Sequence, residues 1–250
     1  MPIKLGSTDI TTLKLGSTDV SQAYLGSTAL LSTSYNFGNY IVSDGVNDRG
    51  DMATTWSPSR FTDMVVSFWF KSSGNGTINM IIGGSDTSDY IFLRDGGTPN
   101  VRLASNQAGN GRRAEWNSIN PFDGDWHHFY FYYVNPADVQ LVYDGVDKGG
   151  GGANFNGWDI DILFTRGNNT FFTQAGIDDL IMDTRTGSVS EAQALYNSGA
   201  GANPLTVLGS TPDIWYKFDV ADGTTTISNN GLSSNDLTLS NFVTPYIFLH

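Results

Sequence analysis

The sequence is built from a series of short apolar runs, each followed by a segment of turn-forming residues. The runs are rich in β-branched and aromatic residues, and Gly, Asn and Asp dominate the segments between them. This pattern predicts an antiparallel β-sandwich or barrel. One short helix is expected at 190–196, with Ser188 or Ser190 as its N-cap and Gly199 at its end. The expected strands are 65–71, 78–82, 90–93, 126–134, 139–143 and 160–164.

Composition agrees with a β protein and excludes several functions. The chain has 250 residues, enough to bury a sizeable core, and contains 29 Gly with 13% aromatic residues. It has no Cys, so disulfides, thiolate metal sites and Cys nucleophiles are excluded. Its 13 basic and 25 acidic residues give a net charge of −12, which argues against nucleic acid or anionic membrane surfaces as partners. No apolar run is long enough for membrane insertion.

A ten-residue repeat occupies the start of the chain, in copies at 3–10, 13–20 and 23–30. Each copy alternates apolar and polar residues and then reaches a Gly-Ser-Thr turn, which predicts three short strands joined by tight turns. Because ten residues are too few to bury both faces of a strand, we expect a partner surface to cover the repeats. The alternative is a β-meander packed on its own domain. We therefore predict a docking arm at 1–33, with Leu5, Leu15 and Leu25 as its contacts, and a sandwich at 34–250.

Several segments of the larger domain, taken in order, resemble one known family. The sequence Asp-Gly-Asp-Trp-His-His-Phe at 123–129 resembles a conserved strand of the laminin-G-like jelly roll, within the concanavalin A-like lectin/glucanase superfamily. The resemblance implies an all-β antiparallel jelly-roll sandwich. The segment at 214–219 looks like one that opens such domains, so a permuted strand order is expected. The other segments that carry the resemblance are 40–48, 67–71, 139–146, 177–183 and 190–196.

The repeats are similar to those of phage structural proteins, such as tail, fibre or capsid decoration components. Together with the lectin-like segments, they imply a non-enzymatic protein on the virion surface. The expected partners are other virion proteins, reached through the arm, and cell-surface glycans, reached through the sandwich. A homo-oligomer is expected, with a trimer as the simplest guess. Two alternatives stay open: a purely structural decoration protein without glycan binding, and a carbohydrate-active enzyme or its binding module.

The titratable residues argue against catalysis. Retaining glycosidases need two carboxylates about 5 Å apart. The only Glu residues are Glu115 and Glu191, 76 positions apart, and the Glu-x-Asp-x-x-Glu motif of the related glucanases is missing. His127 and His128 are neighbours on an expected strand, so they point to opposite faces and cannot chelate one ion. We therefore expect no enzymatic activity and structural roles for both His.

Aromatic residues are the candidates for glycan binding, because their rings stack on the apolar faces of sugars. The strand at 126–134 places Tyr130 and Tyr132 on one face as a possible platform. Trp56, Trp116 and Trp158, in expected loops, are comparable candidates. The alternative is that these rings belong to the core.

Calcium is the expected cofactor. Asp44, Asn47 and Asp48 fall in one Gly-containing loop, and Asp178 approaches from elsewhere in the chain. Calcium prefers several carboxylate, amide and carbonyl oxygens, and such loops supply them. The alternative is that these side chains only form turns by bonding to the backbone.

Overall fold

The computed structural model describes residues 35–74, 76–106, 112–135 and 137–250, together with six short strands within the first 34 residues. Contacts divide the chain into two units, Met1–Asn36 and Phe37–His250. No helix in the described parts of the chain is both long and apolar enough to cross a membrane.

The repeats form three antiparallel hairpins rather than three single strands, which corrects the prediction. Residues pair within one copy, as Leu5 does with Thr8, and only Gly6 and Ser7 stand between them in sequence. A two-residue connection suits a hairpin, so each copy can supply both strands. Leu5, Leu15 and Leu25 lie in three different hairpins, and their side chains are outside the described part of the structure. The pairs are β1 (Lys4–Leu5) with β2 (Thr8–Asp9), β3 (Leu13–Leu15) with β4 (Thr18–Val20), and β5 (Gln22–Leu25) with β6 (Thr28–Ser32).

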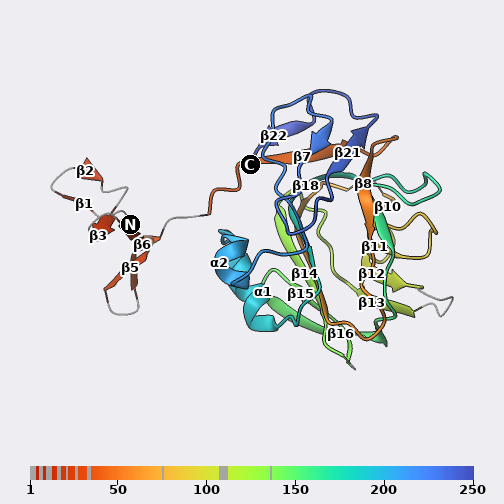
Figure 1. The fold of residues 1–250 in the computed structure, drawn as a ribbon, viewed down its shortest axis with the longest axis horizontal. Helices are drawn as coiled ribbons and strands as arrows, with labels where there is room; N and C mark the ends of the chain where they lie inside the picture. The colour runs from red at the N-terminus through yellow and green to blue at the C-terminus, as the bar shows by residue number, and fades with distance from the viewer. Residues whose placement is uncertain are drawn as a thin grey trace. The chain divides into compact units, whose positions relative to one another are not determined.

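The second unit is a sandwich of two antiparallel sheets, which confirms the predicted jelly-roll fold class (Figure 1). Sheet A runs in the order β13 (Arg112–Asn117), β12 (Asn100–Ser105), β11 (Tyr90–Arg94), β10 (Ile78–Gly83), β17 (Ile160–Leu163), β8 (Arg49–Trp56), β21 (Leu237–Ser240), β20 (Thr226–Ile227). Sheet B runs in the order β16 (Val146–Asn154), β15 (Asp138–Tyr143), β14 (Trp126–Tyr133), β9 (Met64–Lys71), β18 (Gln174–Asp183), β7 (Asn39–Asp44), β22 (Ile247–Leu249), and β19 (Ile214–Tyr216) pairs with β18.

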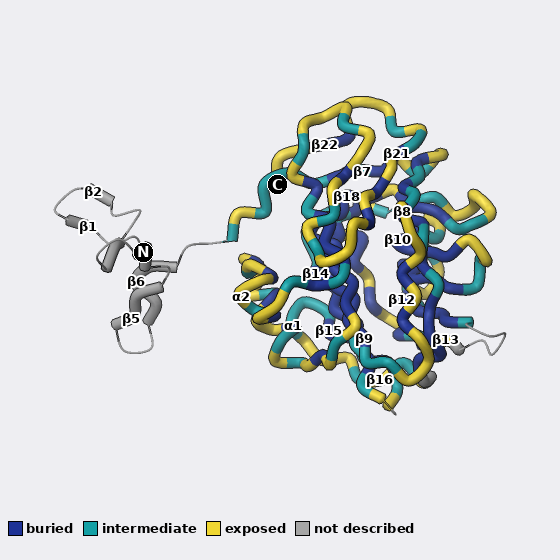
Figure 2. Tube along the Cα trace, viewed as in Figure 1, coloured by how far each residue is buried: buried dark blue, intermediate teal, exposed yellow. Residues whose placement is uncertain are grey.

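The core lies between the two sheets, where Figure 2 shows buried residues along both layers. Alternate residues of each strand point inward, as the period of a strand requires. Phe68 and Phe70 of β9 and Phe129 and Phe131 of β14 point into this core, and the rings of Phe68 and Phe129 stack with centroids 5.3 Å apart. The apolar runs seen in the sequence are therefore the core strands of the sandwich.

Two short helices, α1 (Val189–Tyr196) and α2 (Pro204–Leu208), cover part of the outer face of sheet B. Ser188 is the N-cap of α1, since its Oγ accepts a hydrogen bond of 3.1 Å from the backbone N–H of Glu191. The helix ends at Asn197, in the left-handed conformation with φ 46°, and not at Gly199 as predicted. Asn tolerates this conformation well, so it can end a helix as Gly does.

The C-terminal tail completes both sheets beside the first two strands of the sandwich. β21 pairs with β8 in sheet A, and β22 pairs with β7 in sheet B. The expected permutation concerned 214–219, where β19 pairs with β18, and it stays a prediction. The glycine run at 149–152, which reads as a loop in the sequence, instead belongs to strand β16. There a Cβ on Gly151 would lie 2.6 Å from the Cβ of Ala114, so β13 and β16 can approach only because no side chain stands between them.

Candidate functional site

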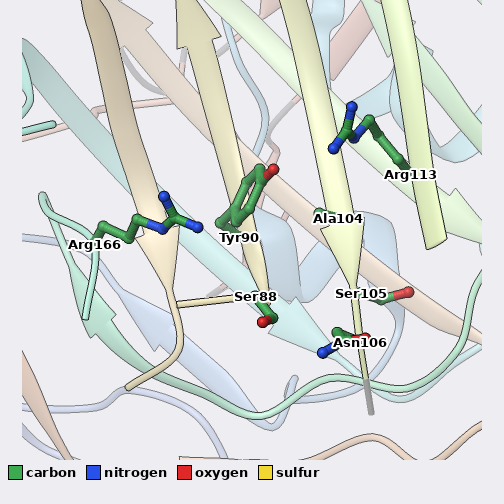
Figure 3. A pocket seen from close by; sticks show the side chains of 7 residues that line it. All are labelled: Ser88, Tyr90, Ala104, Ser105, Asn106, Arg113 and Arg166. Atoms are coloured by element: carbon green, nitrogen blue, oxygen red, sulfur yellow. The ribbon is translucent and has the colours of Figure 1, made fainter. Parts of the chain in front are cut away.

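A hollow of about 510 Å³ lies on the outer face of sheet A (Figure 3). Its lining combines two cationic side chains, one aromatic ring and several hydroxyl and amide groups. No carboxylate is among the lining residues. The lining consists of Ser88, Tyr90, Ala104, Ser105, Asn106, Arg113 and Arg166.

The hollow exists because small residues flank a large one across neighbouring strands. Tyr90 pairs with Gly83 on one side and with Ala104 on the other, and Ala104 pairs in turn with Arg113. Residues that pair directly share one face of a sheet, so all four positions face outward together. With only a methyl group at Ala104, the space between Tyr90 and Arg113 stays open.

Arg166 reaches this face because Gly83 lets its segment come close. A Cβ on Gly83 would lie 3.2 Å from the carbonyl oxygen of Thr165, tighter than most side chains allow. The Nε and Nη2 of Arg166 donate to the carbonyl oxygen of Thr87 at 2.8 and 2.6 Å. Its Cζ lies 5.6 Å from the centroid of the Tyr90 ring. The guanidinium is thus held in place before any ligand arrives.

Arg113 supplies the second cation, and Figure 3 shows it on the opposite side of Tyr90 from Arg166. Its side chain is exposed, and it forms no ion pair with the described part of the chain. An unpaired guanidinium is unexpected on a chain with a net charge of −12, where carboxylates outnumber cations. A guanidinium without a carboxylate partner is free to bind an anion.

A buried carboxylate fixes the position of Asn106 in the lining. Asp89 is only 1% exposed, and its carboxylate accepts hydrogen bonds from the backbone N–H groups of Asn106 and, at 2.9 Å, Asp159. Burial raises the pKa of Asp89 to about 6. Below that pH the carboxyl is protonated and accepts these bonds less strongly, so the lining is best ordered at neutral pH.

The predicted aromatic platform is wrong for four of its five residues. Trp56, Trp116, Tyr130 and Trp158 are between 0 and 7% exposed. Trp158 donates through Nε1 to the carbonyl oxygen of Ala104 at 2.5 Å, beneath the sheet rather than on it. A ring without an exposed face cannot stack on a sugar. Trp56, Trp116 and Trp158 belong to the core, and Tyr130 belongs to the cluster under the helices.

The two candidate Tyr residues of β14, Tyr130 and Tyr132, do lie on the outer face of sheet B, as the alternation predicted. Tyr130 is covered by the helices, and its hydroxyl donates to a carboxylate oxygen of Glu191 in α1. Tyr132 is half-buried and packs against the same cluster. The helices therefore occupy the face that would have bound a sugar at these positions.

The predicted calcium ligands are not brought together. Asp44 pairs with Gln174 across β7 and β18, which leaves Asp178 four positions further along its strand. Asp48 is 2% exposed, and its Oδ2 accepts from the backbone N–H of Asp44 at 2.8 Å. Asn47 lies in the same turn. No group of three or more acidic or His side chains with metal-binding geometry occurs among the described residues. Asp44 and Asp48 each accept a hydrogen bond from a backbone N–H of the loop, and Asp178 does not join them.

The two Glu residues lie apart and each has a cationic partner. Glu115 on β13 pairs with Arg102 at 3.0 Å, and Glu191 in α1 pairs with Arg185 at 2.7 Å. One faces out from sheet A, and the other belongs to the helix over sheet B. They do not form the close carboxylate pair that a retaining glycosidase requires.

His127 and His128 point to opposite faces of β14, as predicted. His128 is buried with its Nε2 2.9 Å from the Oγ of Ser67. His127 contacts the carboxylates of Asp144 and Asp123 at 2.8 and 3.0 Å. Burial lowers the pKa of His127, but the hydrogen bonds to both Asp residues outweigh it and leave the pKa raised. Both His residues therefore tie structural elements together.

The residues that form the hollow were missed in the sequence. The pair Arg112 and Arg113 reads there as a lone basic doublet on an acidic surface. The available signal was the position of Tyr90 at the start of a predicted strand, with Gly83 closing the preceding one. Pairing that Tyr with Ala104 and Arg113 requires the strand register, which the sequence does not give.

No family model matches this sequence, and no curated protein matches it. Solved structures of similar fold include the heptameric SAP-like pentraxin from Limulus polyphemus, with a TM-score of 0.49 and 11% identity over 64% of this chain and 82% of that chain. Domains LG4-5 of the mouse laminin alpha1 chain give 0.42 and 13% over 61% and 44%. The CBM40 of the Ruminococcus gnavus IT-sialidase gives 0.45 and 9% over 65% and 100%. These likenesses concern the fold alone.

Proposed function

We propose that this chain is a non-enzymatic protein of a phage particle whose sandwich binds acidic glycans of the host surface in the hollow of sheet A. One observation carries the glycan-binding part. Two guanidinium groups, Arg113 and Arg166, face one hollow on a chain of net charge −12. Guanidinium forks match the geometry of carboxylate and sulfate groups, and hydroxyl and amide side chains suit sugar hydroxyls.

Binding is favoured over catalysis because the lining has no acid–base pair. Its polar groups are two arginines, two serines, one asparagine and one tyrosine. Glycoside hydrolysis needs a carboxylic acid and a carboxylate on either side of the scissile bond. The lining can therefore hold and orient an acidic sugar, and it offers no group to protonate the leaving oxygen.

A glycan array with the full chain tests the proposal. We expect binding to glycans that carry sialic acid, uronic acid or sulfate groups, and loss of that binding in the double variant Arg113→Ala/Arg166→Ala. Binding to acidic glycans that survives in the double variant would refute the site. If the chain bound no glycan at all, the purely structural decoration protein would be the better account.

The hairpin arm carries the virion part of the proposal. Two-stranded hairpins are marginal alone in water, so three of them in sequence need a surface to pack on. We propose that the arm supplies Leu5, Leu15 and Leu25 to a neighbouring virion protein and places the sandwich on the virion surface. Many displayed copies, in a trimer or larger assembly, would strengthen weak glycan binding by multivalency. Calcium at the loop carboxylates stays a prediction.

The arm is tested by deleting residues 1–33 and isolating particles. We expect the shortened chain to be lost from particles while its acidic glycan binding in solution is unchanged. Particles that keep the shortened chain at normal copy number would refute the docking role.

A further inference from the structure

A second hollow, of about 310 Å³, lies on the outer face of sheet B, at the end that the helices leave uncovered. Its lining is separate from that of the hollow on sheet A, and the two open on opposite outer faces of the sandwich. No acidic residue lines it. The side chains that matter for its chemistry are Tyr40, Lys71, Ser73 and Gln174 around Gly176.

The floor of this groove is a position without a side chain. Gly176 on β18 pairs with Val42 on β7 and with Lys71 on β9, and Lys71 pairs with Trp126 on β14. The four residues form one row across neighbouring strands, facing outward. A Cβ on Gly176 would lie 2.9 Å from Cε2 of Tyr40 and 3.4 Å from the ring of Trp126. Glycine therefore lets the rings of Tyr40 and Trp126 pack closely over the middle of the row.

The wall of the groove is an aromatic ring that is held rigid from behind. Tyr40 is half-buried and meets Trp126 edge to face, with centroids 4.9 Å apart. Trp126 in turn stacks on His250 at 4.3 Å. A supported ring loses little freedom when a ligand stacks on it, and flat sugar faces stack on such rings.

The groove also holds unused hydrogen-bond donors. Within the described chain, neither the ammonium of Lys71 nor the side-chain amide of Gln174 has a hydrogen-bond or ion-pair partner, and the Tyr40 hydroxyl has none either. Burial raises the pKa of Tyr40, so its hydroxyl keeps its proton at neutral pH. These donors surround a stacking surface, and sugar hydroxyls can accept from all of them.

We infer that this groove is a second saccharide site, for a neutral pyranose stacked on Tyr40 with its hydroxyls bonded to Lys71 and Gln174. It deepens the proposed function, because a chain with two such sites on opposite faces joins two glycan strands at once. It does not require the sheet A hollow to bind. A single copy would then be bivalent, without any oligomer.

Saturation-transfer NMR with the full chain tests the groove directly. The probes are methyl glucoside, methyl galactoside and N-acetylglucosamine. We expect transfer to at least one probe, and a loss of affinity of roughly tenfold in the Lys71→Ala/Gln174→Ala variant, as for the loss of about one net hydrogen bond. Lys148→Ala is the matched control, because it removes the same charge from β16 at the far edge of sheet B.

A second arm separates this inference from the proposed function. Arg113→Ala/Arg166→Ala should leave the neutral probes bound, and a methyl sialoside, which contains no neutral pyranose, should not displace them. The inference is refuted if no probe shows transfer, if the groove variant binds as well as the Lys148→Ala control, or if the methyl sialoside competes with the neutral sugar. If only the binding of acidic glycans is lost, the result concerns the sheet A hollow and leaves the groove of sheet B unaffected.

Discussion

The most informative stability prediction concerns Asp178, a carboxyl with no solvent exposure on β18. Its Oδ2 lies 2.8 Å from Nδ1 of His250, whose ring is stacked between Phe37 and Trp126 at 4.1 and 4.3 Å. Burial, with the neighbouring Asp179, raises the pKa of Asp178 to about 10. Burial, with Lys71 nearby, lowers the pKa of His250 to about 4.

These two shifts fix how many protons the pair holds. In the folded chain the pair holds one proton from about pH 4 to about pH 10, whichever of the two side chains carries it. In the unfolded chain, ordinary His250 holds one proton up to about pH 6.5 and Asp178 holds none above about pH 4. The two states bind equal protons from about pH 4 to 6.5, so this pair makes stability flat there. Above that range the folded state holds one more proton, and stability falls.

The slope follows from proton linkage. One proton difference changes the free energy of unfolding by about 1.4 kcal/mol per pH unit, so raising the pH from 6.5 to 8.5 costs about 2.7 kcal/mol. Asp178→Asn removes the titrating carboxyl and keeps a hydrogen-bond donor for Nδ1 of His250. For this pair the variant should gain stability up to about pH 6.5 and then stay level. Other titrating groups, such as His127, are common to both proteins and cancel in the difference.

Urea unfolding at a series of pH values measures this difference. The stability of the variant minus that of the wild type should rise by about 1.4 kcal/mol per pH unit from pH 5 to 9. Two parallel profiles would show that the buried pair holds no proton beyond the unfolded chain, and would refute the reasoning.

Three further predictions concern the sheet A hollow and the core beneath it. Arg113→Ala should weaken binding of acidic glycans by about tenfold in calorimetry, from the loss of one charge-assisted hydrogen bond; Arg94→Ala, with the same charge change further along the same face of β11, should change it less than about twofold. Ala104→Phe should abolish that binding by filling the hollow, with folding checked by thermal melting. Trp158→Ala should lower the free energy of unfolding in urea by about 3–5 kcal/mol and leave the glycan affinity of the folded fraction unchanged. A variant that is as stable as the wild type but has lost affinity would show that Trp158 contacts the ligand.

Much of the sandwich can be predicted from the sequence because strand period and turn chemistry are local. The run at 65–71 became β9 (Met64–Lys71), and the run at 139–143 became β15 (Asp138–Tyr143). The sequence pattern predicts one strand in each repeat, whereas each repeat forms two strands of a hairpin. The glycine run in β16 was read as a loop, since the approach of β13 that favours glycine there is a tertiary contact.

The site was harder to predict because binding surfaces depend on what covers each face. The alternation of β14 correctly placed Tyr130 on an outer face, and only the packing of α1 shows that this face is closed there. Trp126 lies four positions earlier on the same face and is not covered by the helices. The pairing of Tyr90 with Ala104 and Arg113 depends on register across three strands, which no local pattern fixes.

An NMR titration of the isotopically labelled full chain shows whether the sheet A hollow binds an anionic sugar. The probes are sialyllactose, which carries a carboxylate, and a chondroitin sulfate oligosaccharide, which carries sulfate. We expect one or both probes to shift the amide signals of Tyr90, Ala104 and Arg113 and the side-chain Nε–H signals of Arg113 and Arg166. Shifts confined to other surfaces, or no shifts with either probe, would contradict it.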